Sequence, residues 1–474
     1  MKVLLIQPPM FHLKVNVAPN VGIASIAAVL EKEGVTVGVI DAAAENLSFD
    51  QLIHRIKEFA PDLVGAGGQT PVSPRSLQIF RRVKREISPR IYTIAGGPHF
   101  SFTQNESLQE CPALDIVVRG EAEMTVRELC RALETGKDLT GVKGITFRAP
   151  GGEIVSTPDR EPIADLDSLP FPAWHLFPFR NYHWAGNRLL GIASSRGCAF
   201  RCPHCITWKI HKGVRYRKPE RIVEEMRWVK KDFGIDTFFF HDDQTFTRRE
   251  QLEGFLDALE RAKETLYWYF EIREDTLLGY RDLWKRMRDL GMFKVAIGLE
   301  TPNPELRGFY GKKAYQQKEV EGMLSYLEHE LDVLVAIYLL FGSPDDTEET
   351  IQETIKYAKF LYPDYCSFVV GTIVAPFPGT DFYEEMKAKD MITTYDWKYY
   401  GFGKALIKSS VPPEKMVDYF GAFWKGTYVR PNVFLKQLKF AFSKNRFRRS
   451  LARSYVNIAI DFATHGNRTD ATLS

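Results

Sequence analysis

Three cysteines lie within eight residues, at Cys198, Cys202 and Cys205, and give the spacing Cys-x3-Cys-x2-Cys. Each of three thiolates on one loop can bind one iron of a 4Fe-4S cubane. Such a cluster normally has four cysteine ligands, so a loop with three leaves one iron open to an external ligand. The amino and carboxylate groups of an amino acid fit that open position chemically.

A zinc ion is the alternative occupant of this loop. Zinc binds three cysteines and one histidine tetrahedrally, and His204 or His211 is near enough in sequence to complete the set. Redox or structural thiols are a third alternative, which three cysteines so close together disfavour. We favour the iron–sulfur cluster, because a predicted strand stands directly before the loop and a zinc knuckle would not need one.

The elements around this loop alternate between strands and helices. Six strands are predicted near 189–193, 238–240, 267–272, 294–297, 333–340 and 367–374. This pattern predicts a partial (β/α)6 barrel over residues 189–409, whose active site lies at the carboxyl ends of the strands. Three of these ends carry charge, in Asp242-Asp243, Glu271-Ile272-Arg273 and Gly298-Leu299-Glu300. They indicate a site, or salt bridges at the rim of the barrel.

The first 140 residues also alternate between strands and helices. Strands near 3–6, 35–40, 63–66, 91–95 and 116–118 predict a doubly wound, Rossmann-like parallel sheet. Ligands of such sheets bind beyond the carboxyl ends of the strands, where this chain has Gly67-Gly68-Gln69-Thr70, Gly96-Gly97-Pro98-His99 and Arg119-Gly120-Glu121. These glycines predict a ligand site or simply tight turns.

Two further segments complete the chain. Residues 141–188 are rich in proline and predict a linker. Residues 410–474 predict a helical segment, and between Tyr419 and Ile460 it carries nine Lys and Arg but no Asp or Glu. Interleaved aromatic residues would suit a membrane or anionic partner, whereas a solvated helix face packed on the barrel is the simpler interpretation.

Length, composition and charge limit the classes of protein. The 474 residues, 45% of them hydrophobic, can form about three domains. The formal net charge of +3 is too small to indicate nucleic-acid binding, and we expect none. No long apolar stretch indicates a membrane span or signal peptide, so we expect a cytoplasmic protein.

The cysteine spacing, directly after the first barrel strand, resembles the radical S-adenosylmethionine superfamily. His204 stands where that family usually has an aromatic residue before its third cysteine. The resemblance implies that the open iron binds S-adenosylmethionine, which an electron from the cluster cleaves to a 5'-deoxyadenosyl radical. It also makes Asp243, Arg273 and Glu300 candidates for contacts with S-adenosylmethionine.

The two halves together resemble the cobalamin-binding class of that superfamily. The matching segments are Gly96–His99, Val118–Glu123 and the linker segment Asp167–Pro172. The resemblance is greatest to the anaerobic magnesium-protoporphyrin IX monomethyl ester cyclase group, and extends to Arg430-Pro431. It implies cobalamin as a cofactor, with candidate contacts at Thr70, Ser73, Gly96, Gly97 and Gly120.

The lower axial ligand of that cobalamin is not predicted. Cobalamin proteins that displace the lower base usually carry Asp-x-His-x-x-Gly in the first loop. This chain has no such motif, and His12 stands alone.

The resulting hypothesis is an enzyme that functionalises an unactivated carbon of a tetrapyrrole, a lipid or another metabolite, most simply by methyl transfer. Oxidative cyclisation is the first alternative, and a radical enzyme whose N-terminal domain binds no cobalamin is the second. A zinc-containing protein that binds through its basic C-terminal face is the third. The expected partners are a small-molecule or lipid substrate, an external electron donor of the flavodoxin or ferredoxin type, and a membrane surface against residues 410–474.

Overall fold

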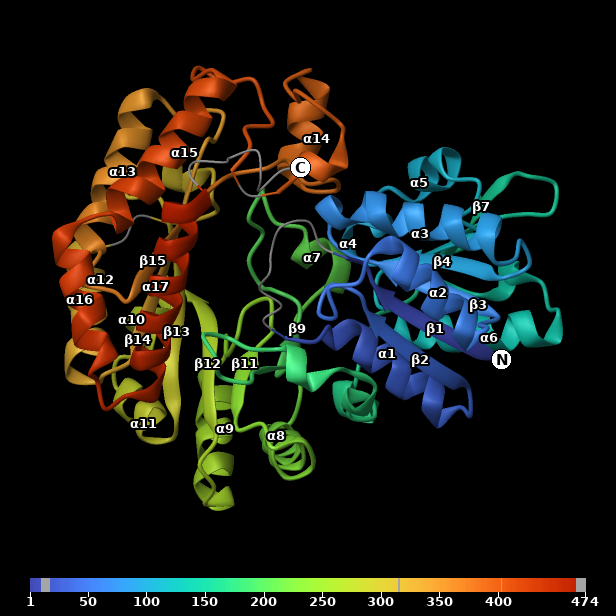
Figure 1. Ribbon diagram of the computed structural model, residues 1–474, viewed down its shortest axis with the longest axis horizontal. Helices are drawn as coiled ribbons and strands as arrows, with labels where there is room; N and C mark the ends of the chain where they lie inside the picture. Colours follow the sequence, from blue (N-terminus) through green and yellow to red (C-terminus); the bar gives the residue numbers. More distant parts are fainter. Residues whose placement is uncertain (10–17, 314–315, 402, 466–474) are drawn as a thin grey trace.

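The protein consists of two α/β parts that lie side by side (Figure 1). The computed structural model describes residues 1–9, 18–313, 316–401 and 403–465, with side chains as far as residue 455. His12 lies outside the described residues. The N-terminal part, in blue and cyan, contains one sheet, and the second part contains the other sheet and the C-terminal helices. The predicted fold class is confirmed.

The first sheet has the strand order β2-β1-β3-β4-β5-β6-β7. Its first five strands are parallel and follow the flavodoxin-like order of doubly wound sheets. These strands are β1 (Lys2–Gln7), β2 (Thr36–Asp41), β3 (Leu63–Gly67), β4 (Tyr92–Gly96) and β5 (Ile116–Val118). The helices are α1 (Val21–Lys32), α2 (Phe49–Phe59), α3 (Ser73–Glu86), α4 (Pro98–Phe102), α5 (Gln104–Glu110) and α6 (Glu123–Thr135).

Helices pack on both faces of this sheet. Apolar side chains of α2 and α3 form one core with the sheet, and those of α1 and α6 form the other. Because both faces are covered, the parallel strands are almost entirely apolar, and this explains why their sequences read as short hydrophobic runs.

Two antiparallel strands, β6 (Ile145–Arg148) and β7 (Ile154–Ser156), extend the first sheet beyond residue 140. They lie inside residues 141–188, which we expected to form a linker. Ile145 and Phe147 are buried against the α1 and α6 side of the sheet, so long-range contacts hold these strands. Thr146 and Arg148 interrupt the apolar residues of β6, and the Gly151-Gly152 turn follows, so the sequence shows no hydrophobic run here.

The second sheet contains all six predicted strands. They are β8 (Leu190–Ile192), β11 (Thr237–Phe240), β12 (Tyr267–Arg273), β13 (Met292–Glu300), β14 (Leu334–Phe341) and β15 (Phe368–Ile373). Each pairs in parallel with the next, and the described residues do not pair β15 with β8. The sheet is therefore an open, partial barrel.

Helices cover the outside of the barrel and bury its largest core. They are α8 (Pro219–Phe233), α9 (Arg249–Ala262), α10 (Glu274–Gly279), α11 (Trp284–Asp289), α12 (Gln317–Ser325) and α13 (Glu348–Leu361). A further helix, α14 (Asp381–Ala388), packs in a smaller core of its own with Val374, Ile392 and Ile407. Within the described residues, no helix is both long and apolar enough to cross a bilayer.

The C-terminal segment forms α15 (Pro413–Tyr428), α16 (Pro431–Ala441) and α17 (Arg446–His465). Its helical character was predicted, but four of the nine basic residues between residues 419 and 460 bind the barrel and Arg449 binds within the segment. Five of the nine donate to carbonyl or carboxylate oxygens, namely Arg430, Lys436, Arg446, Arg448 and Arg449. The segment is therefore not the uniformly basic surface that its sequence indicated.

Glu328 is the centre of this attachment. It lies fully buried in the short helix η7 (Tyr326–Glu330) and accepts from Arg448 Nη1 at 2.8 Å, while Lys436 Nζ lies 3.0 Å away. Ser367 Oγ donates to it at 2.9 Å. Burial alone would raise the pKa of Glu328, but the two cations outweigh burial and lower it.

We predict that Glu328→Gln loosens the C-terminal helices from the barrel. Removing one partner of a buried ion pair leaves the other charge uncompensated, at a cost of about 3 kcal/mol. The measurement is the midpoint urea concentration at which a brief trypsin pulse cleaves half of the protein within the C-terminal segment, residues 410–474. Glu348→Gln, which removes the exposed ion pair with Lys415, is the control. Equal midpoint shifts in the two variants would contradict the prediction.

Candidate functional site

The three cysteines lie on a loop that begins after β8. The ends of the loop are joined where β9 (Ser195–Arg196) pairs antiparallel with β10 (Arg215–Tyr216). Within it, the Cys205 amide donates to the Cys202 carbonyl at 3.0 Å, and the short helix α7 (Thr207–His211) follows. All three thiols are free and partly exposed. The loop thus presents three sulfur atoms near the carboxyl ends of the barrel strands.

Two aspartates after β11 hold the start of this loop. Asp242 accepts from the backbone amides of Ser194 and Ser195, at 2.8 and 2.6 Å, and Asp243 accepts from the Gly197 amide at 2.9 Å. Burial raises the pKa of Asp242 to about 6. Asp243, which we predicted to contact S-adenosylmethionine, therefore binds the backbone of the cysteine loop.

Gly197 is required where it stands. Its φ is 93°, and a Cβ atom there would lie 1.8 Å from the Gly213 carbonyl oxygen. No other residue fits this turn without moving the backbone. The two ends of the cysteine loop can therefore approach each other closely.

Arg273, at the end of β12, lies beside a cysteine. Its Nη1 lies 3.6 Å from Cys202 Sγ, its Nη2 donates to the Gly311 carbonyl at 3.2 Å, and its guanidinium lies 4.0 Å from the centre of the Phe200 ring. A buried cation here compensates negative charge on sulfur. The sequence placed Arg273 at the site, and the structure places it beside the thiols.

Glu300, at the end of β13, is less directly placed. Its φ of 62° turns the chain at a register shift between β13 and β14, and Lys312 Nζ lies 3.4 Å from its carboxylate. Lys312 also donates to Glu274 and to the Gly298 carbonyl, both at 2.6 Å. Burial raises the pKa of Glu300. This carboxylate already has a cationic partner.

The surroundings of the loop suit a bound cluster. Burial raises the pKa of Cys198 to about 11 and also raises that of Cys202, so these thiols are protonated until a metal displaces the protons. Within the described residues, His204 Nδ1 and Trp208 Nε1 are buried without a hydrogen-bond partner. Buried polar atoms without a partner are rare and indicate a missing group nearby.

The two histidines that could complete a zinc site have other neighbours. The His204 ring packs against Phe309 and Tyr310, and the His211 Nδ1 bonds to Glu121 at 3.1 Å. In the described part of the chain, no three His, Cys, Asp or Glu side chains are gathered closely enough to hold one metal ion, and this includes the three cysteines. The finding therefore does not separate zinc from a cluster.

The glycines at the carboxyl ends of β3 and β4 lie against each other. The Gly68 amide donates to the Gly96 carbonyl at 3.1 Å, and a Cβ atom on Gly67 would lie 2.1 Å from that carbonyl oxygen. Gly97, with a φ of 94°, starts α4. The predicted Gly96 and Gly97 therefore form a surface of bare backbone at the edge of the sheet.

Thr70 and Ser73 lie beside this surface and are buried. The Ser73 hydroxyl donates to the Thr70 carbonyl at 2.8 Å, and Thr70 Oγ1 lies 3.3 Å from His99 Nδ1. Burial lowers the pKa of His99 to about 4. Its ring packs edge-on against Trp397 from the second part of the chain. This edge of the first sheet thus faces the barrel.

Gly120, after β5, completes the set of predicted cobalamin contacts. Its φ is 65°, its amide donates to Ser101 Oγ at 3.1 Å, and a Cβ atom added to it would meet nothing within 4 Å. The structure therefore brings all five predicted residues to the carboxyl ends of three neighbouring strands, with open space at Gly120.

Glu121, the next residue, binds the cysteine loop. It accepts from Arg215 Nη1 at 3.0 Å and from the Ile163 amide at 3.0 Å, and it also pairs with His211. Burial alone would raise the pKa of Glu121, but these hydrogen bonds lower it well below the usual value. Glu121 has no predicted role, because the sequence does not show which carboxylate at a strand end binds basic residues of the other part of the chain.

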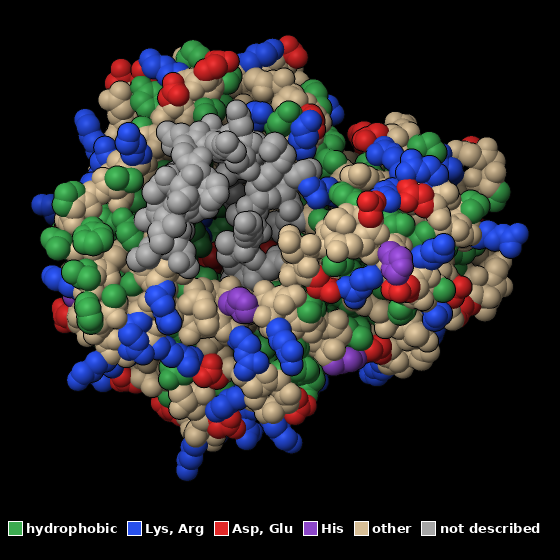
Figure 2. Space-filling view, viewed as in Figure 1, with side chains coloured by type: hydrophobic (Ala, Val, Ile, Leu, Met, Phe, Trp, Pro, Cys, Tyr) green, Lys and Arg blue, Asp and Glu red, His purple; other side chains and the backbone are tan. Residues whose placement is uncertain are grey.

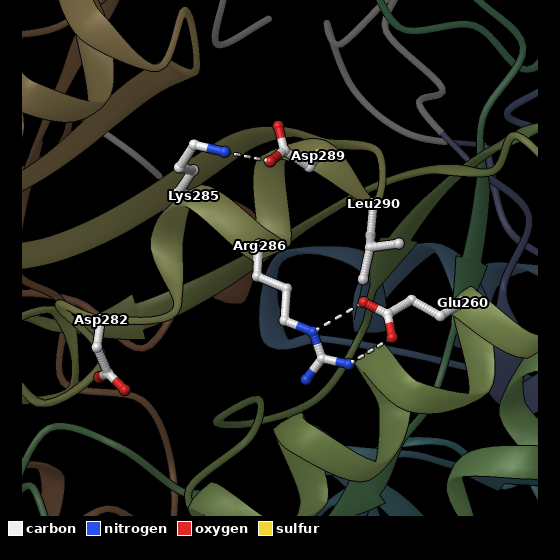
Figure 3. A pocket seen from close by; sticks show the side chains of 6 residues that line it. All are labelled: Glu260, Asp282, Lys285, Arg286, Asp289 and Leu290. Carbon is white, nitrogen blue, oxygen red and sulfur yellow. Dashed lines mark hydrogen bonds and ion pairs between the residues drawn. The ribbon is translucent and has the colours of Figure 1, made fainter.

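A surface hollow of about 330 Å³ lies apart from this site (Figure 3). Its charged side chains pair with one another, as in Lys285 with Asp289 and Arg286 with Glu260. It lies on α9, α11 and their loops, outside the barrel, and contributes nothing to the site. Its lining residues are Glu260, Asp282, Lys285, Arg286, Asp289 and Leu290.

Comparisons with known families match both parts of the chain. The B12 binding domain family matches residues 15–130, and the Radical SAM superfamily matches residues 192–358. The second match contains the cysteine loop, and the first contains Thr70, Ser73, Gly96, Gly97 and Gly120.

Individual relatives match over nearly the whole chain. An uncharacterized methyltransferase of Pyrococcus horikoshii is 30% identical over 448 residues, which cover 92% of this chain and 95% of the relative. The anaerobic magnesium-protoporphyrin IX monomethyl ester cyclase of Rubrivivax gelatinosus is 29% identical, with 86% of this chain and 74% of the cyclase covered.

Two solved structures share the fold. The cobalamin-dependent S-adenosylmethionine radical enzyme OxsB superposes with a TM-score of 0.74 at 15% identity, over 98% of this chain and 71% of OxsB. The radical S-adenosylmethionine methyltransferase TsrM of Kitasatospora setae superposes with a TM-score of 0.70 at 19% identity, over 96% of this chain and 99% of TsrM. With the sequence matches, these likenesses leave one assignment: the chain belongs to the radical S-adenosylmethionine superfamily, in the group whose members carry an N-terminal B12 binding domain.

Proposed function

We propose that this protein cleaves S-adenosylmethionine at a 4Fe-4S cluster and methylates an unactivated carbon with the help of cobalamin. The observation that carries the proposal is the meeting of the cysteine loop, with Arg273 beside Cys202, and the glycine edge of the first sheet, through Glu121. When bound, the cluster would supply an electron for cleavage, and cobalamin would supply the methyl group.

The roles of this chain's residues follow from their positions. Cys198, Cys202 and Cys205 would hold the cluster, and Arg273 would offset its negative charge. Asp243 and Glu300 keep their proposed place near S-adenosylmethionine, through the loop and Lys312 respectively.

For cobalamin, the contacts that we propose lie on the first sheet. The bare backbone at Gly96, Gly97 and Gly120 would allow close approach of a large ring or its tail. The Thr70 hydroxyl would offer a hydrogen bond there, and Ser73, whose buried hydroxyl donates to the Thr70 carbonyl, would hold Thr70 in place.

Methyl transfer is favoured over cyclisation by the extent of the matches. The chain covers 95% of the methyltransferase from Pyrococcus horikoshii but 71–83% of the cyclases from three organisms. Oxidative cyclisation is the second candidate function, since those cyclases are nearly as similar in sequence. The substrate class, a tetrapyrrole, lipid or other metabolite, is a proposal from the relatives, which include a hopanoid methylase and bacteriochlorophyllide methyltransferases.

Two partners belong to this proposal. A one-electron donor of the flavodoxin or ferredoxin type would reduce the cluster, because the chain has no second group of cysteines for a redox relay. A membrane surface would contact the C-terminal segment of an otherwise cytoplasmic enzyme.

We predict that Cys202→Ala abolishes both cluster assembly and production of 5'-deoxyadenosine. Loss of one thiolate removes the ligand of one iron. Iron and sulfide are measured on protein produced anaerobically, and 5'-deoxyadenosine is measured after addition of dithionite and S-adenosylmethionine. Cys130→Ala, which removes a buried thiol in α6, is the control and keeps its iron. Undiminished 5'-deoxyadenosine from Cys202→Ala would refute the proposal.

We also predict that Gly120→Asn lowers the amount of cobalamin bound, several-fold, without affecting iron content. Asn tolerates a positive φ, and the added side chain would fill the open space at the strand end rather than clash with protein. Gly136→Asn is a matched control, since Gly136 has a φ of 64° and equally open surroundings at the end of α6. Cobalamin is quantified by its visible spectrum after purification with the vitamin supplied. Equal cobalamin in both variants would remove Gly120 from the site.

A further inference from the structure

The helix α16 turns an apolar side to the solvent. Five large hydrophobic side chains there are 47–83% exposed, and they account for five of the eight exposed ones among the described residues. We call them the α16 patch; they are Val429, Phe434, Leu435, Leu438 and Phe442. Exposed apolar patches of this kind mark surfaces that bind other proteins or membranes.

The opposite side of α16 holds a charged residue against the barrel. Lys436 donates to the Cys366 carbonyl at 2.7 Å and pairs with buried Glu328. Val433 and Phe440 are also buried. A surface helix normally buries its apolar side and exposes its charges, so α16 is only partly of this kind.

The charged residues that flank the α16 patch in the sequence are all basic. Lys425, Lys439 and Lys444 are exposed, and the described residues give their side chains no hydrogen bond or ion pair. No Asp or Glu occurs between residues 419 and 460. Figure 2 shows hydrophobic side chains gathered at the left edge of the molecule, over α16, with Lys and Arg around them.

We propose that the α16 patch docks on the surface of an anionic lipid bilayer. Phe434, Leu438 and Phe442 would enter the boundary between headgroups and acyl chains, as the apolar side chains of interfacial helices do. The three free lysines would lie at the level of the lipid phosphates, where each adds to the attraction.

A second copy of this chain suits the patch less well. Pairing two copies through the α16 patch would bring together Lys425, Lys439 and Lys444 from both, with no acidic residue of this segment to compensate. The bilayer supplies both the apolar layer and the negative charge.

The proposal differs from simple electrostatic adhesion. Because the barrel holds four of the nine basic residues between residues 419 and 460 and Arg449 donates within the segment itself, most of the attraction would come from apolar side chains. Binding should therefore fall only moderately as salt is raised. The proposal rests on the membrane contact named in the proposed function and specifies the surface and the lipid charge. Its test does not depend on the proposed catalysis.

The test is co-sedimentation of the full-length, anaerobically purified protein with vesicles. Vesicles of equimolar phosphatidylcholine and phosphatidylglycerol should bind the protein, and pure phosphatidylcholine should bind it roughly tenfold less or weaker still. The triple variant Phe434→Ser/Leu438→Ser/Phe442→Ser should bind anionic vesicles roughly a hundredfold less tightly. Tyr92→Ser, which removes an exposed aromatic ring from the first sheet, is the matched control and should bind as the wild type does.

A second measurement needs no variant. Hydrogen–deuterium exchange of the wild-type protein should slow within residues 429–444 when anionic vesicles are added. Protection elsewhere, or no binding to anionic vesicles, would overturn the proposal. A dimer in light scattering that the triple variant dissociates, without vesicle binding, would overturn it in favour of self-association.

Discussion

The contact between Glu121 and the cysteine loop joins the two halves of the site. The Glu121 side chain is 5% exposed, and a carboxylate so buried is costly unless cations and hydrogen bonds satisfy it. His211 and Arg215 come from the far end of the loop, Arg196 from its start, and the Ile163 amide from the connecting segment. One carboxylate therefore fixes the end of β5, the connection and the loop together. Glu121 thereby links the strand-end edge of the first sheet to the loop that carries the three thiols.

The polar residues at the barrel strand ends make different contacts, and the sequence did not predict which residue makes which contact. Hydrophobic runs that end at a charged residue predict that Asp243, Arg273 and Glu300 lie at strand ends. The structure brings all three close to the cysteine loop. Which of them meets sulfur depends on side-chain geometry. Asp243 holds the Gly197 amide and Glu300 meets Lys312, whereas Arg273 reaches Cys202. No periodicity in the sequence carries that information.

The fold itself was largely predictable, since buried parallel strands and amphipathic helices differ in their repeat. The five parallel strands of the first sheet and the six of the barrel follow from this difference. β6 and β7 were missed although β5 and β8 are as short. Thr146 and Arg148 alternate with the apolar residues of β6, and β7 ends at Ser156, so neither strand is a plain hydrophobic run. The direction of the C-terminal basic residues was missed for a different reason. A run of basic residues forms a charged surface only if none of them pairs with a buried carboxylate. Their partner Glu328 lies about a hundred residues earlier in the sequence, so the pairing cannot be predicted from the run itself.

The same carboxylate sets what the far side of the molecule presents. Pairing Lys436 with Glu328 fixes the rotation of α16 about its axis. Since residues three and four positions apart share a helix face, turning Lys436, Val433 and Phe440 inward turns Phe434, Leu438 and Phe442 outward. Rotation of α16 would expose Val433 and Phe440 and would separate Lys436 from buried Glu328. The ion pair therefore holds an otherwise unfavourable apolar surface in place, at the edge of the molecule farthest from the first sheet (Figure 1). Docking there would leave the cleavage site and the cobalamin edge free.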